Sequence, residues 1–199
     1  PVDKLIDKDY AKEIRARIPL DRARDSAEVA PTKNLAYESP ETTHYSVMDA
    51  EGNAVSNTYT LNFGFGNGIM AAGTGILLNN ELDDFDHLPF EPDANGNVSG
   101  KANAQEPRKR PRSSMTPTIV FKDDMPFLLT GSPGGGTIIN TVFQMVMNVI
   151  EFDMNVAAAS SKARINHQWM PDMTTIEKGV SQDTINILES MGHKFNYGR

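Results

Sequence analysis

The chain has 199 residues, with 19 Lys and Arg against 26 Asp and Glu, so its formal net charge is −7. A chain of this length can bury a core and usually forms one domain. The acidic balance argues against a general nucleic-acid-binding protein, and no apolar stretch approaches the ~18 residues of a membrane span. The absence of cysteine excludes thiol nucleophiles, thiolate metal sites and disulfides.

The first 41 residues differ in character from the rest of the chain. An apolar or aromatic residue recurs at every fourth position from Ile6 to Ile18, which predicts one amphipathic helix. Pro19 is expected to end this helix, because proline cannot continue the hydrogen-bond ladder. Residues 21–41 are polar, interrupted by proline and without periodicity, which is typical of a linker. Since structureless stretches of about 20 residues are unusual inside a compact domain, we expect a boundary near its end.

Four short runs rich in β-branched and aromatic residues predict two hairpins. The runs are residues 44–49, 54–61, 116–121 and 127–130, with turns at residues 50–53 and 122–124. A glycine-rich loop at residues 64–75 and a polar loop at residues 86–107 separate the hairpins, and we expect the polar loop to be exposed.

The second half of the chain predicts helices with one short strand between them. The expected elements are a buried helix over residues 138–152, a helix from Asn155 to Arg164, a strand over residues 175–178 and a helix from Ser181 to Met191. The order of elements predicts an α+β or layered α/β fold with mostly antiparallel pairing.

Three groups of residues can carry chemistry, and each also has a plain structural interpretation. The glycine turn at residues 131–136 can bind an anion through backbone N–H groups, or simply join a strand to a helix. The carboxylates of residues 81, 83 and 84 can act in acid–base chemistry or hold a cation, or belong to an ordinary polar loop. The basic run at residues 108–112 is most simply solvated surface, and Ser113 and Ser114 after it offer hydroxyls to a ligand.

Thr42 and Thr43 lie where the expected linker ends and the first expected strand begins. A threonine hydroxyl is a weak nucleophile unless a base removes its proton, and a free α-amine with a pKa of about 8 on the same residue can do so. That chemistry requires cleavage of the bond between Glu41 and Thr42; otherwise these are ordinary threonines at a strand start. The four histidines, His44 among them, show no metal-ligand spacing, so we expect surface or packing roles for them.

Four motifs follow one another along the chain: residues 42–46 (TTHYS), 75–85 (GILLNNELDDF), 111–115 (PRSSM) and 131–135 (GSPGG). In this order and approximate spacing they resemble the γ-glutamyltranspeptidases (glutathione hydrolases), and the resemblance runs over essentially the whole chain. It implies the α+β fold of the N-terminal nucleophile hydrolases, an αββα four-layer sandwich of two stacked antiparallel sheets flanked by helices. This chain would hold part of that sandwich.

The resemblance also implies a precursor that cleaves itself just before Thr42. Residues 1–41 would be the tail of the large subunit, and residues 42–199 most of the small, catalytic subunit. The chain stops short of the family's last strands and lacks most of the large subunit, including the family arginine that pairs with the substrate carboxylate. We therefore expect it to be a fragment that depends on the rest of the large subunit for maturation and activity.

Nine residues acquire roles from the resemblance. Thr42 would be the nucleophile in self-cleavage and then in catalysis, where its hydroxyl attacks the γ-amide carbonyl of glutathione and its freed amine acts as the base. Thr60 would orient this nucleophile. The other residues would bind the substrate or the transition state: Asn62, Glu81 and Asp84 the α-amino group, Ser113 and Ser114 the α-carboxylate, and Gly134 and Gly135 the oxyanion.

The γ-glutamyl group would then pass to water, an amino acid or a dipeptide. The resemblance implies no cofactor, no metal ion, no nucleic acid and no membrane partner, and a bacterial member would be periplasmic or secreted. Many bacterial members carry an aromatic lid residue where this chain has Asn95, so we do not expect a lid that closes by aromatic packing. The balance between hydrolysis and transfer stays open.

Two alternatives remain. A related acylase, or a capsule-type γ-polyglutamate transferase, would use the same threonine with another acyl donor. The carboxylates at 81 and 84 and the serines at 113 and 114 favour a free γ-glutamyl α-amino acid head, and hence glutathione-like donors. A non-catalytic interaction domain that kept the family fold is the alternative from a different functional class.

Overall fold

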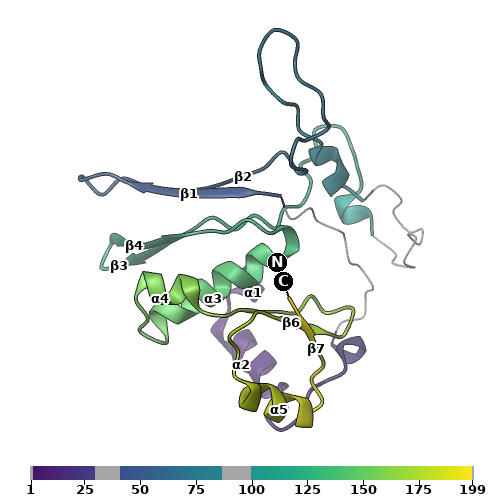
Figure 1. Ribbon diagram of the computed structural model, residues 1–199, viewed down its shortest axis with the longest axis vertical. Helices are drawn as coiled ribbons and strands as arrows, with labels where there is room; N and C mark the ends of the chain where they lie inside the picture. The colour runs from purple at the N-terminus through teal and green to yellow at the C-terminus, as the bar shows by residue number, and fades with distance from the viewer. Residues whose placement is uncertain (1, 30–40, 87–99, 199) are drawn as a thin grey trace. The chain divides into compact units, whose positions relative to one another are not determined.

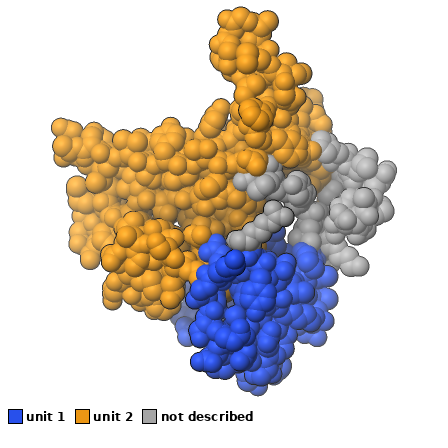
Figure 2. Space-filling view, in the orientation of Figure 1, with its two compact units in different colours: residues 1–31, 167–199 blue, residues 32–166 orange. Residues whose placement is uncertain are grey.

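The computed structural model describes residues 2–29, 41–86 and 100–198, so the predicted lid position, Asn95, lies outside the described residues. The chain divides into two compact units, unit 1 with residues 1–31 and 167–199 and unit 2 with residues 32–166 (Figure 2). The predicted subunits, residues 1–41 and 42–199, would be separated by a cleavage reaction rather than by packing, so this division stays a prediction. None of the helices in the described ranges is long and apolar enough to cross a lipid bilayer.

Unit 2 stacks two antiparallel hairpins and a helical layer in the order β, β, α (Figure 1). The elements are β1 (Thr43–Met48), β2 (Ala54–Tyr59), β3 (Thr118–Lys122), β4 (Met125–Thr130), α3 (Ile138–Ile150), α4 (Val156–Ser161) and the short strand β5 (Ile165–Asn166). Both predicted hairpins are confirmed, with β1 paired to β2 and β3 paired to β4. The order of layers matches part of the expected αββα sandwich.

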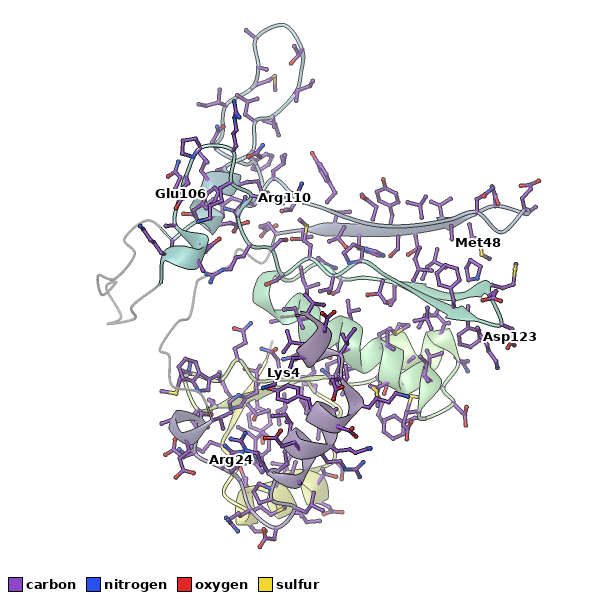
Figure 3. All side chains as sticks on the ribbon, turned by 180° about the vertical axis from the view of Figure 1, so that it is seen from behind. Lys4, Arg24, Met48, Glu106, Arg110 and Asp123 are labelled. Carbon is purple, nitrogen blue, oxygen red and sulfur yellow. The ribbon has the colours of Figure 1, made fainter. Side chains whose placement is uncertain are left out.

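The two hairpin turns lie at the same end of unit 2. Met48 at the end of β1 and Asp123 in the second turn are close together in Figure 3, far from the segment that carries Glu106 and Arg110. Asp123 and Asp124 both have positive φ, 52° and 62°, as a two-residue type I′ turn requires. The start of β1 and the end of β4 therefore meet at the opposite end, where the predicted site residues begin.

The helix predicted to be buried over residues 138–152 is only half covered. In α3, Ile138 and Val142 are buried, whereas Ile139 and Phe143 are 51% and 60% exposed. One face packs against β4, and the apolar residues on the other face have no such cover among the described residues. The expectation of burial on most sides was wrong for this chain.

The expectation that the polar loop at residues 86–107 is exposed was also partly wrong. A short 3₁₀ turn, η3 (Lys101–Asn103), follows the part that is not described, and the next residue, Ala104, is only 7% exposed. A second 3₁₀ turn, η2 (Glu81–Asp84), precedes the loop and carries the predicted carboxylates. The backbone N–H of Asp86 donates to the carbonyl of Asn103, so both ends of the loop are joined.

Unit 1 combines the beginning and the end of the chain. Its elements are α1 (Val2–Leu5), α2 (Lys8–Ala16), η1 (Ser26–Glu28), β6 (Thr174–Ile176), α5 (Gln182–Ser190) and β7 (Phe195–Tyr197), and β6 pairs with β7 in parallel. Ile176 and Ile185 form its buried apolar centre. The strand predicted at residues 175–178 and the helix predicted from Ser181 are confirmed with slightly different ends, and β7 was not predicted.

The helix predicted from Ile6 to Ile18 is confirmed as α2 with shorter ends, and a separate helix, α1, precedes it. The Asp7 carboxylate accepts from the backbone N–H groups of Asp9 and Tyr10, both at 2.8 Å, and so begins α2 at Lys8. The linker prediction fails at its start, because Ser26 in η1 is only 5% exposed. A polar composition alone does not show that a serine is buried against a distant segment.

Candidate functional site

Seven of the nine predicted site residues line one small cavity in unit 2. They are Thr42, Thr60, Asn62, Asp84, Ser113, Ser114 and Gly135, and Met115 and Ile138 complete the lining. The two others, Glu81 and Gly134, lie directly beside lining residues but are not part of the lining. Met115 and Ile138 were not predicted; Met115 belongs to the PRSSM motif, while nothing in the sequence singles out Ile138.

The bond before Thr42 is held by two hydroxyl groups. The Thr42 and Thr60 hydroxyls each donate to the carbonyl oxygen of Glu41 at 2.7 Å. The Thr60 hydroxyl also accepts from the backbone N–H of Asn62 at 2.9 Å, which fixes its direction. Two donors on one carbonyl polarise it toward attack at carbon. Thr60 thus acts here on the carbonyl, and its expected contact with the Thr42 hydroxyl stays a prediction.

Two carboxylates lie side by side in η2. Burial, together with the hydrogen bond to Asp84 and the negative charge of that residue, raises the pKa of Glu81 to about 7. The Oε1 atom of Glu81 is buried and has no hydrogen-bond partner. An unpaired buried acceptor is costly, and an ammonium group placed between the two carboxylates would satisfy it.

The serine hydroxyls reach the same cavity from the segment that precedes β3. Ser114 is buried, and the Ser113 hydroxyl accepts from the backbone N–H of Met115 at 3.2 Å. Hydroxyls that share a cavity with the Asp84 carboxylate offer donors for an anionic group next to acceptors for a cationic group. That combination suits the α-amino acid end of a substrate.

The glycine turn after β4 has backbone angles that favour glycine. Gly134 and Gly135 have φ of 128° and 55°, and Gly135 is buried at the cavity. The backbone N–H and the hydroxyl of Thr137 donate to the Gly134 carbonyl at 3.1 and 2.8 Å. The Ser132 hydroxyl donates to the Pro133 carbonyl.

His44 has the packing role expected for it. Its ring nitrogens lie 2.9 Å from the Thr58 hydroxyl and 3.0 Å from the Ser46 hydroxyl, and burial lowers the pKa of the ring. A Cβ on Gly131 would overlap this ring, so the glycine allows β1 to pack against the end of β4. Across the described ranges, no group of three or more His, Asp or Glu residues is arranged to hold a metal ion.

The comparisons with known proteins agree on one family. A family model described as Gamma-glutamyltranspeptidase matches residues 1–199. The "Glutathione hydrolase proenzyme" of Escherichia coli (strain K12) is 53% identical over 194 residues, which are 98% of this chain and 33% of that protein. The chain thus spans about a third of the length of the curated relatives it matches.

Two solved structures extend this result to the fold. A Helicobacter pylori γ-glutamyltranspeptidase mutant is similar with a TM-score of 0.72 and 50% identity, over 78% of this chain and 84% of that chain. Cephalosporin acylase from Bacillus halodurans is similar with a TM-score of 0.77 and 27% identity, over 100% of this chain and 33% of that chain. The layers of unit 2 are therefore part of the N-terminal nucleophile hydrolase sandwich, and the chain belongs to the γ-glutamyltranspeptidase family.

Proposed function

We propose that this chain carries the catalytic centre of an enzyme that hydrolyses glutathione and related γ-glutamyl compounds and transfers the γ-glutamyl group to amino acids or dipeptides. The observation that carries the proposal is the cavity in which Thr42 meets Asp84 and the serine pair. The rest of the large subunit would complete the site. We also propose a periplasmic or secreted location, on the basis of family habit.

Self-cleavage would come first. The Thr42 hydroxyl attacks the carbonyl carbon of Glu41, and the oxygen that becomes negative already accepts from the Thr60 hydroxyl at 2.7 Å. The carbon–nitrogen bond then breaks as the nitrogen takes up the hydroxyl proton, which leaves an ester on the threonine oxygen. Water hydrolyses this ester, giving a carboxylate on Glu41 and a free α-amine on Thr42.

Catalysis would reuse the same hydroxyl. Its proton passes to the new α-amine, whose pKa of about 8 suits a base near neutral pH. The oxygen attacks the γ-amide carbonyl, and the N–H groups of Gly134 and Gly135 stabilise the oxyanion. The leaving amine takes the proton, and water or an acceptor amine then releases the γ-glutamyl group from the threonine ester.

Recognition of the donor separates this function from its alternatives. Glu81 and Asp84 would bind the α-ammonium group, and Ser113 and Ser114 the α-carboxylate. An acylase for a donor without this head has no need of two adjacent carboxylates, one of which has a buried, unpaired oxygen. The pair therefore favours γ-glutamyl donors over other acyl donors.

The test uses the precursor, by which we mean the longer polypeptide that joins this chain to the rest of the large subunit. Intact mass is followed during incubation for the unmodified precursor, Thr42→Ala and the matched control Thr43→Ala. We expect the unmodified precursor and the control to yield a fragment that begins at Thr42, and Thr42→Ala to remain whole. Cleavage of Thr42→Ala at the same bond would exclude Thr42 as the nucleophile, and an unmodified precursor that never matures would favour a non-catalytic domain.

A further inference from the structure

Asn103 connects the two segments that would bind the substrate head. Its Nδ2 atom donates to the carbonyl oxygen of Asp84 at 2.7 Å, and its Oδ1 atom accepts from the backbone N–H of Arg112 at 2.9 Å. Asp84 lines the cavity, and so does Ser113, the residue directly after Arg112. One carboxamide therefore spans from the carboxylate side of the cavity to its hydroxyl side.

The bridge needs the chemistry of asparagine. A carboxamide has donors at one end and an acceptor at the other, and both ends are used here in a partly buried setting. Aspartate would keep the acceptor for Arg112 but would lose the donor to the Asp84 carbonyl. The main chain of Asn103 is fixed as well, because its carbonyl accepts from Asp86 at 2.9 Å and the next residue, Ala104, is buried.

An ion pair also joins the same two segments within the described ranges. Arg112 Nη2 lies 3.6 Å from Asp86 Oδ1, and the two side chains are 36% and 10% exposed. At this distance the two atoms are not in hydrogen-bond contact, so the pair adds attraction between the segments without a fixed direction. Between these two segments, the Asn103 carboxamide supplies the short, directional contacts.

We propose that Asn103 is a positioning residue that sets the distance between the ammonium-binding and carboxylate-binding sides of the cavity, and so the selectivity for donors with a free α-amino acid head. Asn103 is not among the residues that line the cavity, so it acts through Asp84 and Ser113. The inference rests on the proposed function, because it takes these two residues as substrate contacts. A misplacement of about 1 Å in such a site can cost about 10²-fold in rate.

Two donors separate positioning from general support. γ-Glutamyl-p-nitroanilide needs both sides of the cavity at the correct spacing, whereas glutaryl-p-nitroanilide lacks the α-amino group and uses only one side. A loosened bridge should therefore weaken the first donor and leave the second nearly unchanged. A loss of general stability would affect both donors alike. It would also slow self-cleavage, which depends on Glu41, Thr42 and Thr60.

The experiment compares the unmodified precursor with Asn103→Ala, Asn103→Asp and the control Asn53→Ala. The Asn53 amide donates to Asp49 inside the first hairpin turn. This turn lies at the other end of β1 and β2 from the cavity. For both Asn103 variants we expect the KM for γ-glutamyl-p-nitroanilide to rise about 10-fold or more, with self-cleavage and kcat changed by less than about threefold. The preference for the γ-glutamyl over the glutaryl donor should fall by about the same factor as KM rises, and the control should match the unmodified precursor.

An unchanged KM and donor preference in both Asn103 variants would overturn the inference and leave the proposed function standing. A parallel loss of self-cleavage, kcat and melting temperature would also overturn it, since it would show a purely structural role. A precursor that neither cleaves itself nor hydrolyses γ-glutamyl-p-nitroanilide would instead overturn the proposed function, and this inference with it.

Discussion

The two units of this chain use partly buried carboxylates in opposite ways. In unit 1, the Ser26 hydroxyl donates to Asp172 at 2.6 Å and Lys194 lies 3.3 Å away, and these contacts hold the pKa of Asp172 below its usual value. In unit 2, burial and the neighbouring Asp84 raise the pKa of Glu81 to about 7, and one of its oxygens has no partner. A satisfied carboxylate indicates a structural role, whereas an unsatisfied one indicates a site prepared for a cation.

The surroundings of Asp172 support the structural interpretation. Ser26 is buried, and its carbonyl accepts from the indole N–H of Trp169. The backbone N–H of Ala23 donates to the carbonyl of Met191 at 2.6 Å. Residues 23–26 are thus attached to the last part of the chain by contacts that do not depend on the peptide bond after Glu41.

The largest expected effect is on substrate binding by the carboxylates of Glu81 and Asp84. Asp84→Asn in the precursor should raise the KM for γ-glutamyl-p-nitroanilide about 10- to 100-fold, since a hydrogen bond to a charged group contributes about 1.5–3 kcal/mol. Its melting temperature should change little, because removing one of two adjacent carboxylates also removes repulsion. Steady-state kinetics and thermal unfolding measure both quantities.

Asp172→Asn is the matched control for this comparison. It should lower the melting temperature and leave KM unchanged, the reverse of Asp84→Asn. A normal KM in Asp84→Asn, or a raised KM in Asp172→Asn, would contradict the division into a substrate-binding carboxylate and a structural one.

A smaller effect is expected from the serine that satisfies Asp172. Ser26→Ala should reduce the free energy of unfolding of unit 1 by about 1–2 kcal/mol, because a buried hydrogen bond to a charged acceptor is lost. Unfolding in urea can be followed by the fluorescence of Trp169, the only tryptophan of the chain and a member of unit 1. Ser160→Ala is the control, since that exposed hydroxyl donates only to the nearby Ala157 carbonyl.

The effect of Ser26→Ala should depend on pH. A carboxyl whose folded pKa is lowered adds stability above its ordinary pKa of 3.8, and this stability is lost as the pH falls through the lower folded value. The difference between the unmodified chain and Ser26→Ala should therefore be full at pH 7 and shrink below 3.8. An equal difference at both ends of this range would mean that Ser26 acts by packing alone.

Glu81 should show the opposite pH dependence. Its folded pKa of about 7 lies above the ordinary 4.5, so the unfolded chain ionises first and stability falls as the pH rises from 4.5 to about 7. In Glu81→Gln this fall should be missing, so that the melting temperature at pH 8 exceeds that of the unmodified chain. Glu51→Gln, in the exposed first hairpin turn, is the control, and an unchanged pH dependence in Glu81→Gln would contradict the assignment.

Local patterns explain what could be predicted from the sequence. The hairpins follow from alternation and turn residues that act over a few positions. The four motifs contain five of the seven predicted residues that line the cavity, and Thr60 and Asn62 lie between the first two motifs. By contrast, the Ser26–Asp172 bond joins positions 146 residues apart, and Asn103 acts by bridging two backbone segments. A polar residue in a polar stretch looks the same whether it is solvated or forms such a bridge, so neither contact could be read from composition.

The smallest expected effect tests which partner satisfies Asp172. Lys194→Ala removes a charged group 3.3 Å from Asp172, but the lysine side chain is 63% exposed, and exposed ion pairs contribute about 0.2–1 kcal/mol. We therefore expect a smaller loss than in Ser26→Ala, and one that decreases in 1 M salt, where screening acts over about 3 Å. Urea unfolding followed by Trp169 measures it. If Lys194→Ala lowered the free energy of unfolding more than Ser26→Ala, the lysine charge rather than the buried hydroxyl would satisfy Asp172. The contrast with Glu81 would then be one of neighbouring charges, since Asp172 already has a cation beside it and Glu81 has a position for one.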